Sequence, residues 1–535
     1  MYSKVDDPSQ WLLPQALAEQ GARQPDAPWI IMTDGARLTF GEAAADVTRV
    51  AGYLSGLGIK PGDMVAVMMP NGIDLVRAWQ GLGRLGAVAV MLNTELRGAF
   101  LEHQLRNCGA DLAIVDASLL QPALAAGADI DTLKRIIVVG DKPAQATSSQ
   151  ALLDWAGWRQ APAYDGPMPR AEDIACVMYT SGTSGPSKGV LMPHAHCALY
   201  GIGQIKAVQL RETDKYYVTL PLFHANGLLM QLGCTILMGI PAVVRQRFSA
   251  SEWLNDIRQH GCTVSNGLGA LAAFVLLQPP RPEDSQHNLR VLCNAPNLPE
   301  HEAAFRQRFG VGDIVSGFGM TEVNIPVWGR IGQPCPGAAG WAHEEHFEVI
   351  VADPETDRPV PPGELGEILV RPKVPFGFMV GYHNMPERTV EAWRNLWFHT
   401  GDAGIKAADG LITFVDRIKD CIRRRGENIA ATEVESAIGR LEGIEEVAAF
   451  AVPSDIAGGE DELMLAIVPK PGAALAPETV ARFGDGVLPR FATPRYIELL
   501  PELPKTATGK VQRAILRKRG AAHAWDREKA QAKLG

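Results

Sequence analysis

The sequence lacks the features that mark several classes of protein. Its eight cysteines are scattered and form no Cys-x-x-Cys pair, which argues against a zinc site and suits free thiols in a reducing cytosol. The first residues carry charges and no apolar core, so they do not look like a signal peptide. No uncharged apolar run reaches the roughly 18 residues of a membrane-spanning helix. We therefore expect a cytoplasmic protein with no transmembrane segment, while peripheral membrane contact and a homodimer stay open.

An excess of positive charge is also missing. Lys and Arg total 51 against 60 Asp and Glu, a net charge of -9, and such a surface does not attract a polyanion overall. We therefore expect no nucleic-acid partner. The 535 residues, without an internal repeat, exceed what one hydrophobic core organises, so we expect two or more domains.

Helical patterns alternate with apolar runs through most of the chain. Residues 10–30, 41–54 and 74–85 indicate helices, whereas runs such as 64–69 and 87–92 are continuously apolar. Strands of that kind are buried on both faces, as in parallel sheets covered by helices. The sequence therefore predicts an α/β fold with parallel-rich sheets.

Changes in composition divide the chain further. We interpret residues 141–170, rich in Ala, Pro and polar residues, as a connector. From Ile331 onward, prolines and glycines separate short strands, which indicates a small β subdomain. A compact α+β region of roughly 115 residues follows Asp416, the size of one small domain. We predict an N-terminal domain over 1–416 and a C-terminal domain over 421–535.

The most informative stretch is residues 179–189, Tyr-Thr-Ser-Gly-Thr-Ser-Gly-Pro-Ser-Lys-Gly. Its glycines and hydroxyls make a poor helix or strand. They make a good anion cradle, because backbone N–H groups can approach closely and Lys188 adds a positive charge. The stretch follows an apolar strand beginning at Ile174, and open α/β sheets bind ligands at the carboxyl ends of their strands.

Two other readings of this stretch fail. A flexible linker would not have apolar runs close on both sides. The loop of P-loop ATPases needs Gly-Lys-Ser/Thr, whereas Lys188 follows Ser187 and precedes Gly189.

Further patterns lie downstream. Glycines on either side of Phe318 would leave its ring free to stack on an adenine, and the Glu322 carboxylate could hold a magnesium ion; standing alone, the motif could be a simple strand–turn. His399-Thr-Gly-Asp402 reads as a turn whose carboxylate could accept from two vicinal hydroxyls of a ribose. His224 ends an apolar run and, by itself, fits a core histidine as well as a functional one.

The C-terminal region carries basic motifs. Arginines 423–425 precede Gly426 and could meet the phosphates of a ligand or form a solvated strand edge. Residues 416–420 could be ordinary surface charge. Residues 504–513, Pro-Lys-Thr-Ala-Thr-Gly-Lys-Val-Gln-Arg, are nearly a second phosphate-loop motif, or an exposed basic turn.

Together, and in this order over nearly the whole chain, these motifs closely resemble the adenylate-forming superfamily of acyl-CoA synthetases, luciferases and peptide-synthetase adenylation domains. The resemblance is strongest to the carnitine/crotonobetaine and fatty-acid CoA ligase branch. It implies an ATP-dependent acyl-CoA synthetase that uses ATP, Mg²⁺ and coenzyme A. A carboxylic acid would become an acyl-AMP with release of pyrophosphate, and then an acyl-CoA thioester with release of AMP.

The resemblance also implies roles for individual positions. The catalytic lysine is Lys510, with Thr180, Glu322 and His224 beside the reacting groups, and Thr180 and Glu322 on Mg²⁺. Residues 417–420 form the hinge on which the C-terminal lid domain turns, at Lys419. The implied nucleotide-binding positions are Thr180, Ser181, Gly182, Thr183, Ser184, Gly185, Lys188, Asn294, Ala295, Pro296, Gly317, Phe318, Gly319, Met320, Thr321, Asp402, Arg417 and Lys419. Those implied for coenzyme A are Arg424, Arg425, Gly426 and Glu427.

The acyl pocket implied by the resemblance contains His224, Ala225, Gly227, Leu228, Asn266, Gly267, Asn297, Val323 and Trp328. No Arg or Lys stands among these positions, which favours a monocarboxylic acid. Two other functions stay open: an adenylating enzyme that delivers its acyl group to a carrier protein or another nucleophile, and a binding protein without catalysis. Intact Lys188, Glu322, Asp402 and Lys510 argue against the last of these.

Overall fold

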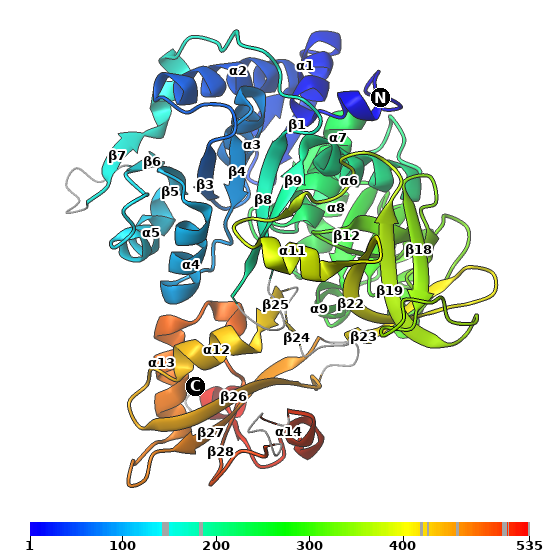
Figure 1. Cartoon of the computed structure of the whole chain (residues 1–535). Coiled ribbons are helices and arrows are strands. Elements are labelled where there is room, and N and C mark those ends of the chain that lie inside the picture. The colour runs from blue at the N-terminus through cyan, green and yellow to red at the C-terminus, as the bar shows by residue number, and fades with distance from the viewer. Residues whose placement is uncertain are drawn as a thin grey trace.

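The computed structural model describes residues 1–141, 149–180, 186–417, 421–424, 427–455, 460–505, 511 and 513–532. Two helix-covered sheets form most of the large N-terminal part, and a smaller α+β unit follows it (Figure 1). The predicted α/β class and the separate C-terminal unit are confirmed. The boundaries 1–416, 417–420 and 421–535 stay predictions.

The first sheet has eight strands and holds the start of the phosphate-loop stretch at one strand end. Its order is β20 (Gly381–Tyr382), β9 (Lys188–Pro193), β8 (Ile174–Thr180), β4 (Val88–Met91), β3 (Met64–Met68), β5 (Leu112–Asp116), β6 (Arg135–Val139) and β7 (Ala151–Asp154). The strands from β8 to β7 pair in parallel, while β9 and β20 add an antiparallel edge. The runs that were continuously apolar in the sequence are the buried strands of this sheet.

The second sheet has seven strands. Its order is β14 (Asp313–Val315), β13 (Val291–Ala295), β12 (Val264–Leu268), β10 (Tyr216–Val218), β11 (Ala242–Val244), β1 (Pro28–Met32) and β2 (Arg37–Thr39). All neighbours pair in parallel except β1 and β2. The carboxyl ends of the parallel strands in both sheets can therefore line a ligand site.

Helices connect and cover these strands. The α-helices of the N-terminal part are α1 (Leu13–Arg23), α2 (Phe40–Gly56), α3 (Ile73–Leu85), α4 (Gly98–Cys108), α5 (Leu120–Gly127), α6 (His194–Ala207), α7 (Gly233–Met238), α8 (Trp253–His260), α9 (Gly269–Leu276), α10 (Pro299–Ala304) and α11 (Pro386–Ala392). A π-helix, Asn226–Leu232, leads directly into α7. The start of α2 shows why a helix begins where it does: Thr39 and Glu42 cap each other's backbone N–H groups.

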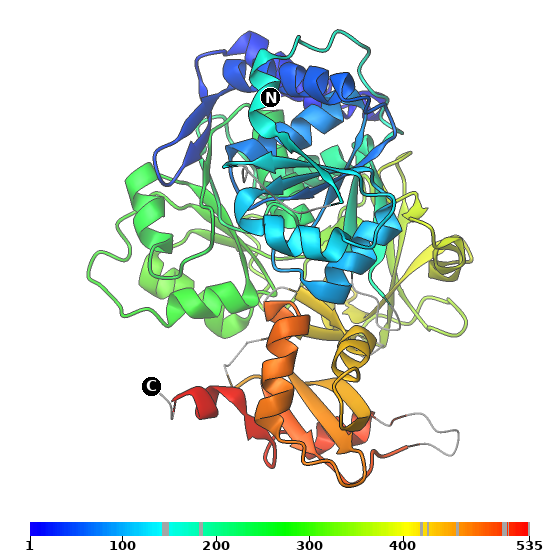
Figure 2. The same cartoon turned by 90° about the vertical axis from the view of Figure 1, so that its left-hand side faces the viewer.

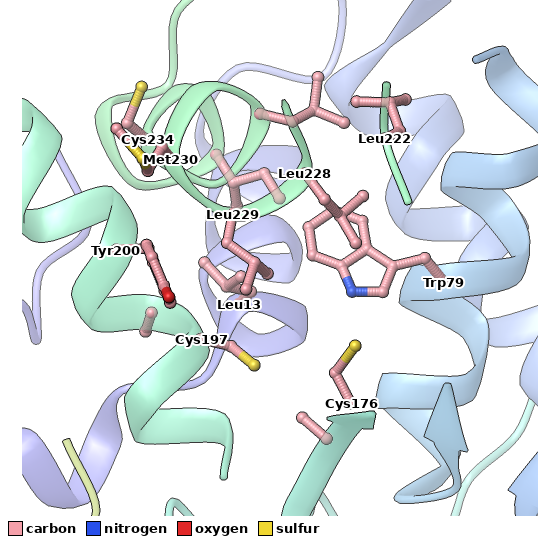
Figure 3. Close-up of a cluster of buried hydrophobic side chains, with 14 of the residues drawn as sticks. Leu13, Trp79, Cys176, Cys197, Tyr200, Leu222, Leu228, Leu229, Met230 and Cys234 are labelled. Carbon is pink, nitrogen blue, oxygen red and sulfur yellow. The ribbon is translucent and has the colours of Figure 1, made fainter. Parts of the chain in front are cut away.

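The main core lies where α1, α3, α6 and the π-helix meet. Leu13, Trp79, Tyr200, Leu228 and Met230 pack together there (Figure 3). Each is 5% exposed or less, so the helix that carries the acyl-pocket candidates is anchored in a close-packed interior.

A β-rich region follows, as predicted from the prolines and glycines. One small sheet comprises β15 (Gly317–Met320), β16 (Asn324–Trp328) and β17 (Trp341–Ala342), and the other β18 (Phe347–Ala352), β19 (Leu365–Pro372), β21 (Trp393–Arg394), β22 (Trp397–Lys406) and β23 (Ile412–Arg417). The interpretation of 141–170 as a connector was incomplete, because β7 and a short 3-10 helix, Trp155–Gln160, lie within it. Likewise, the helix expected over 10–30 spans only Leu13–Arg23.

The C-terminal unit begins with a hairpin of β24 (Cys421–Arg424) and β25 (Glu427–Ala430). Its sheet has the order β26 (Ile444–Val452), β27 (Glu462–Pro469), β28 (Tyr496–Leu499) and β29 (Trp525–Asp526), with helices α12 (Ala431–Ile438), α13 (Pro477–Val487), α14 (Arg513–Arg519) and α15 (Arg527–Ala532). Figure 2 shows α13 below the N-terminal part, and α13 contacts α4. Apolar side chains of both parts join in one buried cluster, among them Phe100 and Val434.

Among the described residues, no helix is long and apolar enough to cross a membrane.

Candidate active site

One large cavity gathers most of the predicted site residues. Its volume is about 1050 Å³, and its walls come from both sheets, the β-rich region and β25. The predicted residues that line it are Thr180, Lys188, His224, Ala225, Gly267, Ala295, Pro296, Asn297, Gly317, Phe318, Gly319, Met320, Thr321, Glu322, Trp328, Asp402 and Glu427. Segments far apart in the sequence thus meet at the carboxyl ends of β8, β12 and β13.

A buried carboxylate stands at the end of β8. Thr180 Oγ1 and the Tyr382 hydroxyl each donate to Glu322 Oε1 over 3.0 Å. Glu322 is 2% exposed, and its Oε2 has no hydrogen-bond partner among the described residues. A buried carboxylate oxygen without a donor is costly unless a cation meets it. This arrangement fits a hard divalent ion with oxygen ligands, as Mg²⁺ requires.

Lys188 begins the strand that returns beside β8. Its ammonium lies 4.0 Å from the centroid of the Tyr382 ring, a cation–π contact that holds the charge next to Glu322's hydroxyl partner. The lysine, the threonine hydroxyl and the carboxylate therefore share one end of the cavity, where phosphate and metal could be bound together.

Phe318 provides a flat apolar surface on another wall. It is 8% exposed and stacks at 6.0 Å and 23° on Phe414, a residue absent from the predicted set. The next residue must be glycine, because a Cβ on Gly319 would lie 2.2 Å from the Asn324 carbonyl oxygen. Glu322 follows in the turn between β15 and β16, so the motif 317–322 has the strand–turn form that we considered from the sequence.

Asp402 is buried in β22, so the prediction that residues 399–402 form a turn was wrong. Gly401 has a φ of +73°, and the pairing with β19 shifts register next to it. This bulge bends the strand and leaves Asp402, 2% exposed, on the cavity wall. The backbone of Arg417 is its partner in β23; the structure does not describe the Arg417 side chain.

Asn294 to Asn297 follow the end of β13. Asn294 is 1% exposed, and its amide nitrogen donates to the Pro296 carbonyl over 3.1 Å. Asn297 is 2% exposed and donates to Glu302 over 2.6 Å. Ala295, Pro296 and Asn297 line the cavity, whereas Asn294 lies behind Gly267.

His224 joins the N-terminal part to the C-terminal unit. Its Nε2 lies 2.8 Å from Glu427 Oε1, and Asn93 Nδ2 donates to the same oxygen over 3.1 Å. A second cavity of about 50 Å³ lies between the two parts, and both His224 and Glu427 line it as well as the large cavity. The histidine therefore stands at the junction of two spaces.

Glu433 makes a second contact across the same junction. Its carboxylate accepts a hydrogen bond from the Ser187 backbone N–H over 2.5 Å. Burial raises the pKa of this carboxyl from 4.5 to about 7, against the opposing effect of that hydrogen bond. No sequence pattern singled out Glu433, because only the fold brings α12 to the phosphate-loop stretch.

Six uncharged residues from α6, the π-helix, β13 and β16 line part of this cavity, and we call them the acyl wall: Tyr200, Asn226, Met230, Cys293, Ile325 and Trp328. Of these, the sequence predicted only Trp328. Four predicted pocket residues do not line the cavity, and two of them, Leu228 and Val323, are fully buried in the core. Gly227 packs against the Pro221 carbonyl, and Asn266 lies behind Asn226. The sequence pattern located the segments but not the faces they present.

Arg424 departs from both readings of the arginine run. It is 4% exposed and pairs with Glu462 at 2.5 Å, and it also donates to the Phe491 carbonyl at 3.2 Å. In this arrangement it stabilises the C-terminal unit, because neither solvent nor a cavity reaches its charge. Other predicted positions lie outside the described residues: Ser181, Gly182, Thr183, Ser184, Gly185, Lys419, Arg425, Gly426 and Lys510.

Comparison with known proteins adds to this geometry. A model of the AMP-binding enzyme family matches residues 17–383, and a model of the AMP-binding enzyme C-terminal domain matches 433–510. A sulfoacetate–CoA ligase of Cupriavidus necator is 30% identical over 509 residues, covering 94% of this chain and 96% of the relative. A crotonobetaine/carnitine–CoA ligase of Salmonella typhimurium is 28% identical over 489 residues, covering 89% and 92%. The crystal structure of the anthranilate CoA ligase AuaEII with anthranoyl-AMP matches with a TM-score of 0.70 and 27% identity, covering 94% and 96%.

Proposed function

Because the chain belongs to the AMP-binding enzyme family, we propose that it joins a carboxylic acid to coenzyme A in two steps at the large cavity. In the first, the carboxylate attacks the α-phosphate of ATP, giving an acyl-AMP and pyrophosphate. In the second, the thiol of coenzyme A attacks the acyl carbonyl and AMP leaves. The chain is thus an AMP-forming acid–thiol ligase. The observation that carries the proposal is the convergence of Lys188, Glu322, Phe318 and Asp402 on one cavity.

The first step brings two anions together, so the protein must mainly position them and neutralise charge. Lys188 and the hydroxyl of Thr180 stand where the outgoing phosphates would lie. Mg²⁺, when bound, would offset phosphate charge, and the bare Oε2 of buried Glu322 would hold it. Lys510, outside the described residues, would meet the carboxylate and the α-phosphate.

Two residues that line the cavity would hold the nucleoside. Phe318 would offer its ring face to the adenine, and the Asp402 carboxylate would accept hydrogen bonds from the ribose hydroxyls. Both side chains are held by strands, in β15 and β22, so little ordering remains to be done when ATP binds.

The second step needs an open path for a thiol. With His224 drawn toward Glu427, its ring is fixed at the junction of the two cavities. We assign His224 as the gate between the thiol path and the acyl pocket, and Glu427 as the residue that holds this gate. The contact depends on the C-terminal unit, so the position of that unit controls the path.

The substrate is a monocarboxylic acid with an uncharged acyl group. Two relatives are named for acids that carry a second charged group besides the carboxylate. Sulfoacetate has a sulfonate, and crotonobetaine and carnitine have a trimethylammonium. Neither the pocket positions predicted from the sequence nor the acyl wall includes an Arg or Lys for a sulfonate, or a carboxylate for an ammonium. A cytoplasmic location and a homodimer remain predictions from the sequence.

Mass spectrometry of the products tests this function. The enzyme is incubated with ATP, Mg²⁺, coenzyme A and a panel of short-chain, long-chain, aromatic and alicyclic acids, with sulfonated and trimethylammonium acids included. We expect an acyl-CoA, AMP and pyrophosphate from at least one uncharged acid. Accumulation of acyl-adenylate with coenzyme A unconsumed would contradict the second step and point to another acceptor of the acyl group.

A further inference from the structure

Behind the acyl wall runs a chain of buried polar side chains, and the inference drawn from it rests on the proposed function. Gln204 in α6, Tyr216 in β10 and Asn266 in β12 are each 1% exposed or less. A pocket for a purely hydrocarbon acyl group needs no such network. Burying a polar group is costly unless it finds a partner, and each amide NH₂ group of Gln204 and Asn266 finds one, whereas Gln204 Oε1 has none among the described residues. The direction of these hydrogen bonds is therefore informative.

The hydrogen bonds run toward the cavity. Gln204 Nε2 donates to the Tyr216 oxygen at 2.6 Å and to Asn266 Oδ1 at 3.2 Å. The Tyr216 hydroxyl donates to Asn266 Oδ1 at 2.5 Å. With its oxygen occupied, Asn266 donates through Nδ2 to Asn226 Oδ1 at 2.8 Å.

Asn226 ends this chain on the acyl wall. Gln231 Nε2 donates a second hydrogen bond to Asn226 Oδ1, at 3.1 Å. The two residues are five apart, and the π-helix that starts at Asn226 brings them onto one face. Two donors on the carbonyl oxygen fix the side-chain amide, so its NH₂ group is the part left for the cavity. No described residue accepts from that nitrogen.

Two other polar groups of the acyl wall are not available to a ligand. The Trp328 indole nitrogen is buried beside Gly203 of α6. The Tyr200 hydroxyl donates to the Met320 carbonyl at 2.9 Å. The Asn226 amide is therefore the donor that the acyl wall offers, and an N–H donor without charge suits an uncharged oxygen acceptor.

We propose that Asn226 is a specificity-determining residue, and that the acyl group carries a carbonyl or ether oxygen that accepts a hydrogen bond from Asn226 Nδ2. The substrate class is then an uncharged oxo- or alkoxy-carboxylic acid. A hydrocarbon chain of the same length would leave a desolvated donor behind, and sites built to hydrogen-bond a substrate group discriminate strongly against analogues that lack it.

Matched pairs of acids test the proposal. Each pair has the same skeleton, with a ketone or ether oxygen in one member and a methylene in the other, and adenylation is followed by pyrophosphate exchange. We expect kcat/KM to favour the oxygen-bearing member by about 10-fold or more at the best chain position. Asn226→Leu should reduce that preference to within about 2-fold, whereas exposed Asn288→Leu should leave it as in the wild type.

Binding provides a readout that is independent of turnover. Non-hydrolysable acyl-sulfamoyl-adenosine analogues of the same pairs are titrated calorimetrically into wild type, Asn226→Leu and Asn226→Ala, with circular dichroism to show that each variant is folded. Only the oxygen-bearing analogue should lose affinity in the variants.

Three outcomes decide between the hypotheses. A wild type without preference within any pair would overturn this inference. An equal loss for both members in Asn226→Leu would also overturn it, because the Asn226 amide would then bind the carboxylate that both acids share. Should no acid support exchange or thioester formation, the proposed function fails, and that result is distinguishable because neither member of any pair would react.

Discussion

The two ends of the cavity are built differently. At the nucleotide end, Lys188, Glu322 and Asp402 are charged residues at strand ends or bulges, and each belongs to a contiguous motif. At the acyl end, neutral side chains come from four separate elements: α6, the π-helix, β13 and β16. Charge must be placed where phosphate charge changes, whereas selectivity for an uncharged acyl group depends on shape and on hydrogen bonds aimed by residues behind the wall.

From this difference we expect substitutions at the nucleotide end to lower the reaction rate for every acid. Substitutions at the acyl end should instead change which acid is preferred. Lys510→Ala should have the largest effect, lowering the rate of adenylate formation by ~10²–10³, as expected for losing one preorganised charge contact. Thioester formation from supplied acyl-adenylate should be retained. Rapid-quench measurements of each half-reaction give the result, and equal losses in both would contradict a role confined to the first step.

Glu322→Gln should act next most strongly. The variant keeps the side-chain shape and the hydrogen bonds from Thr180 and Tyr382, but it removes the charge that would meet Mg²⁺. We expect adenylation to fall about 10²-fold at a fixed metal concentration. A titration with MgCl₂ should show half-saturation at a higher concentration, and exposed Glu300→Gln serves as the control. Unchanged metal dependence would remove Glu322 from the metal site.

The sequence predicted more residues of the nucleotide end than of the acyl end. The nucleotide end was predictable because motifs such as 317–322 place their glycines and acids within a few residues. Even there, the bulge at Gly401 was read as a turn, since local composition does not reveal the β19 partner that makes it a strand. The acyl wall was mostly missed. Whether Gly227 or Asn226 faces the cavity depends on a π-helix, and no periodicity in so short a segment fixes that.

Contacts between the N-terminal part and the C-terminal unit could not be predicted from local sequence patterns either. The run 423–425 suggested phosphate binding or solvent, yet Arg424 is paired with Glu462 inside its own unit. Glu427 and Glu433 meet His224 and Ser187 across more than 200 positions, a separation that composition and spacing cannot bridge. Only the resemblance to a family pointed to this region.

Glu427→Ala should affect the second step more than the first. His224 would lose its partner at 2.8 Å, and a hydrogen bond to a charged group contributes about 1.5–3 kcal/mol. We therefore expect thioester formation to slow about 10-fold, with adenylation changed by less than about 2-fold. Asn93 donates a hydrogen bond to Glu427, and Asn93→Ala should have the smaller effect because it leaves the contact between His224 and Glu427 in place. Similar losses from both variants would mean that Glu427 matters for packing and not for the gate.

The smallest expected effect is a pH dependence at Glu433. Burial against the N-terminal part raises the pKa of the Glu433 carboxyl from 4.5 to about 7. Between these two pH values the carboxyl is therefore protonated when the C-terminal unit contacts the N-terminal part, and ionised when the two are apart. The stabilisation of the domain contact by this proton is therefore full below pH 4.5, declines as the pH rises, and is lost above about pH 7. Glu433→Gln imitates the protonated form at every pH.

Single-turnover thioester formation from supplied acyl-adenylate, measured from pH 5.5 to 8.5, reports this difference. The ratio of wild-type to Glu433→Gln rates should be close to one at pH 5.5 and fall a few-fold by pH 8.5, with its midpoint near 7. Taking the ratio cancels the pH dependence of the coenzyme A thiol, which is the same for both proteins. Exposed Glu442→Gln should give a ratio that does not change with pH. A flat ratio for Glu433→Gln would mean that the contact with Ser187 does not limit the second step, leaving His224 and Glu427 as the link between domain position and the acyl end.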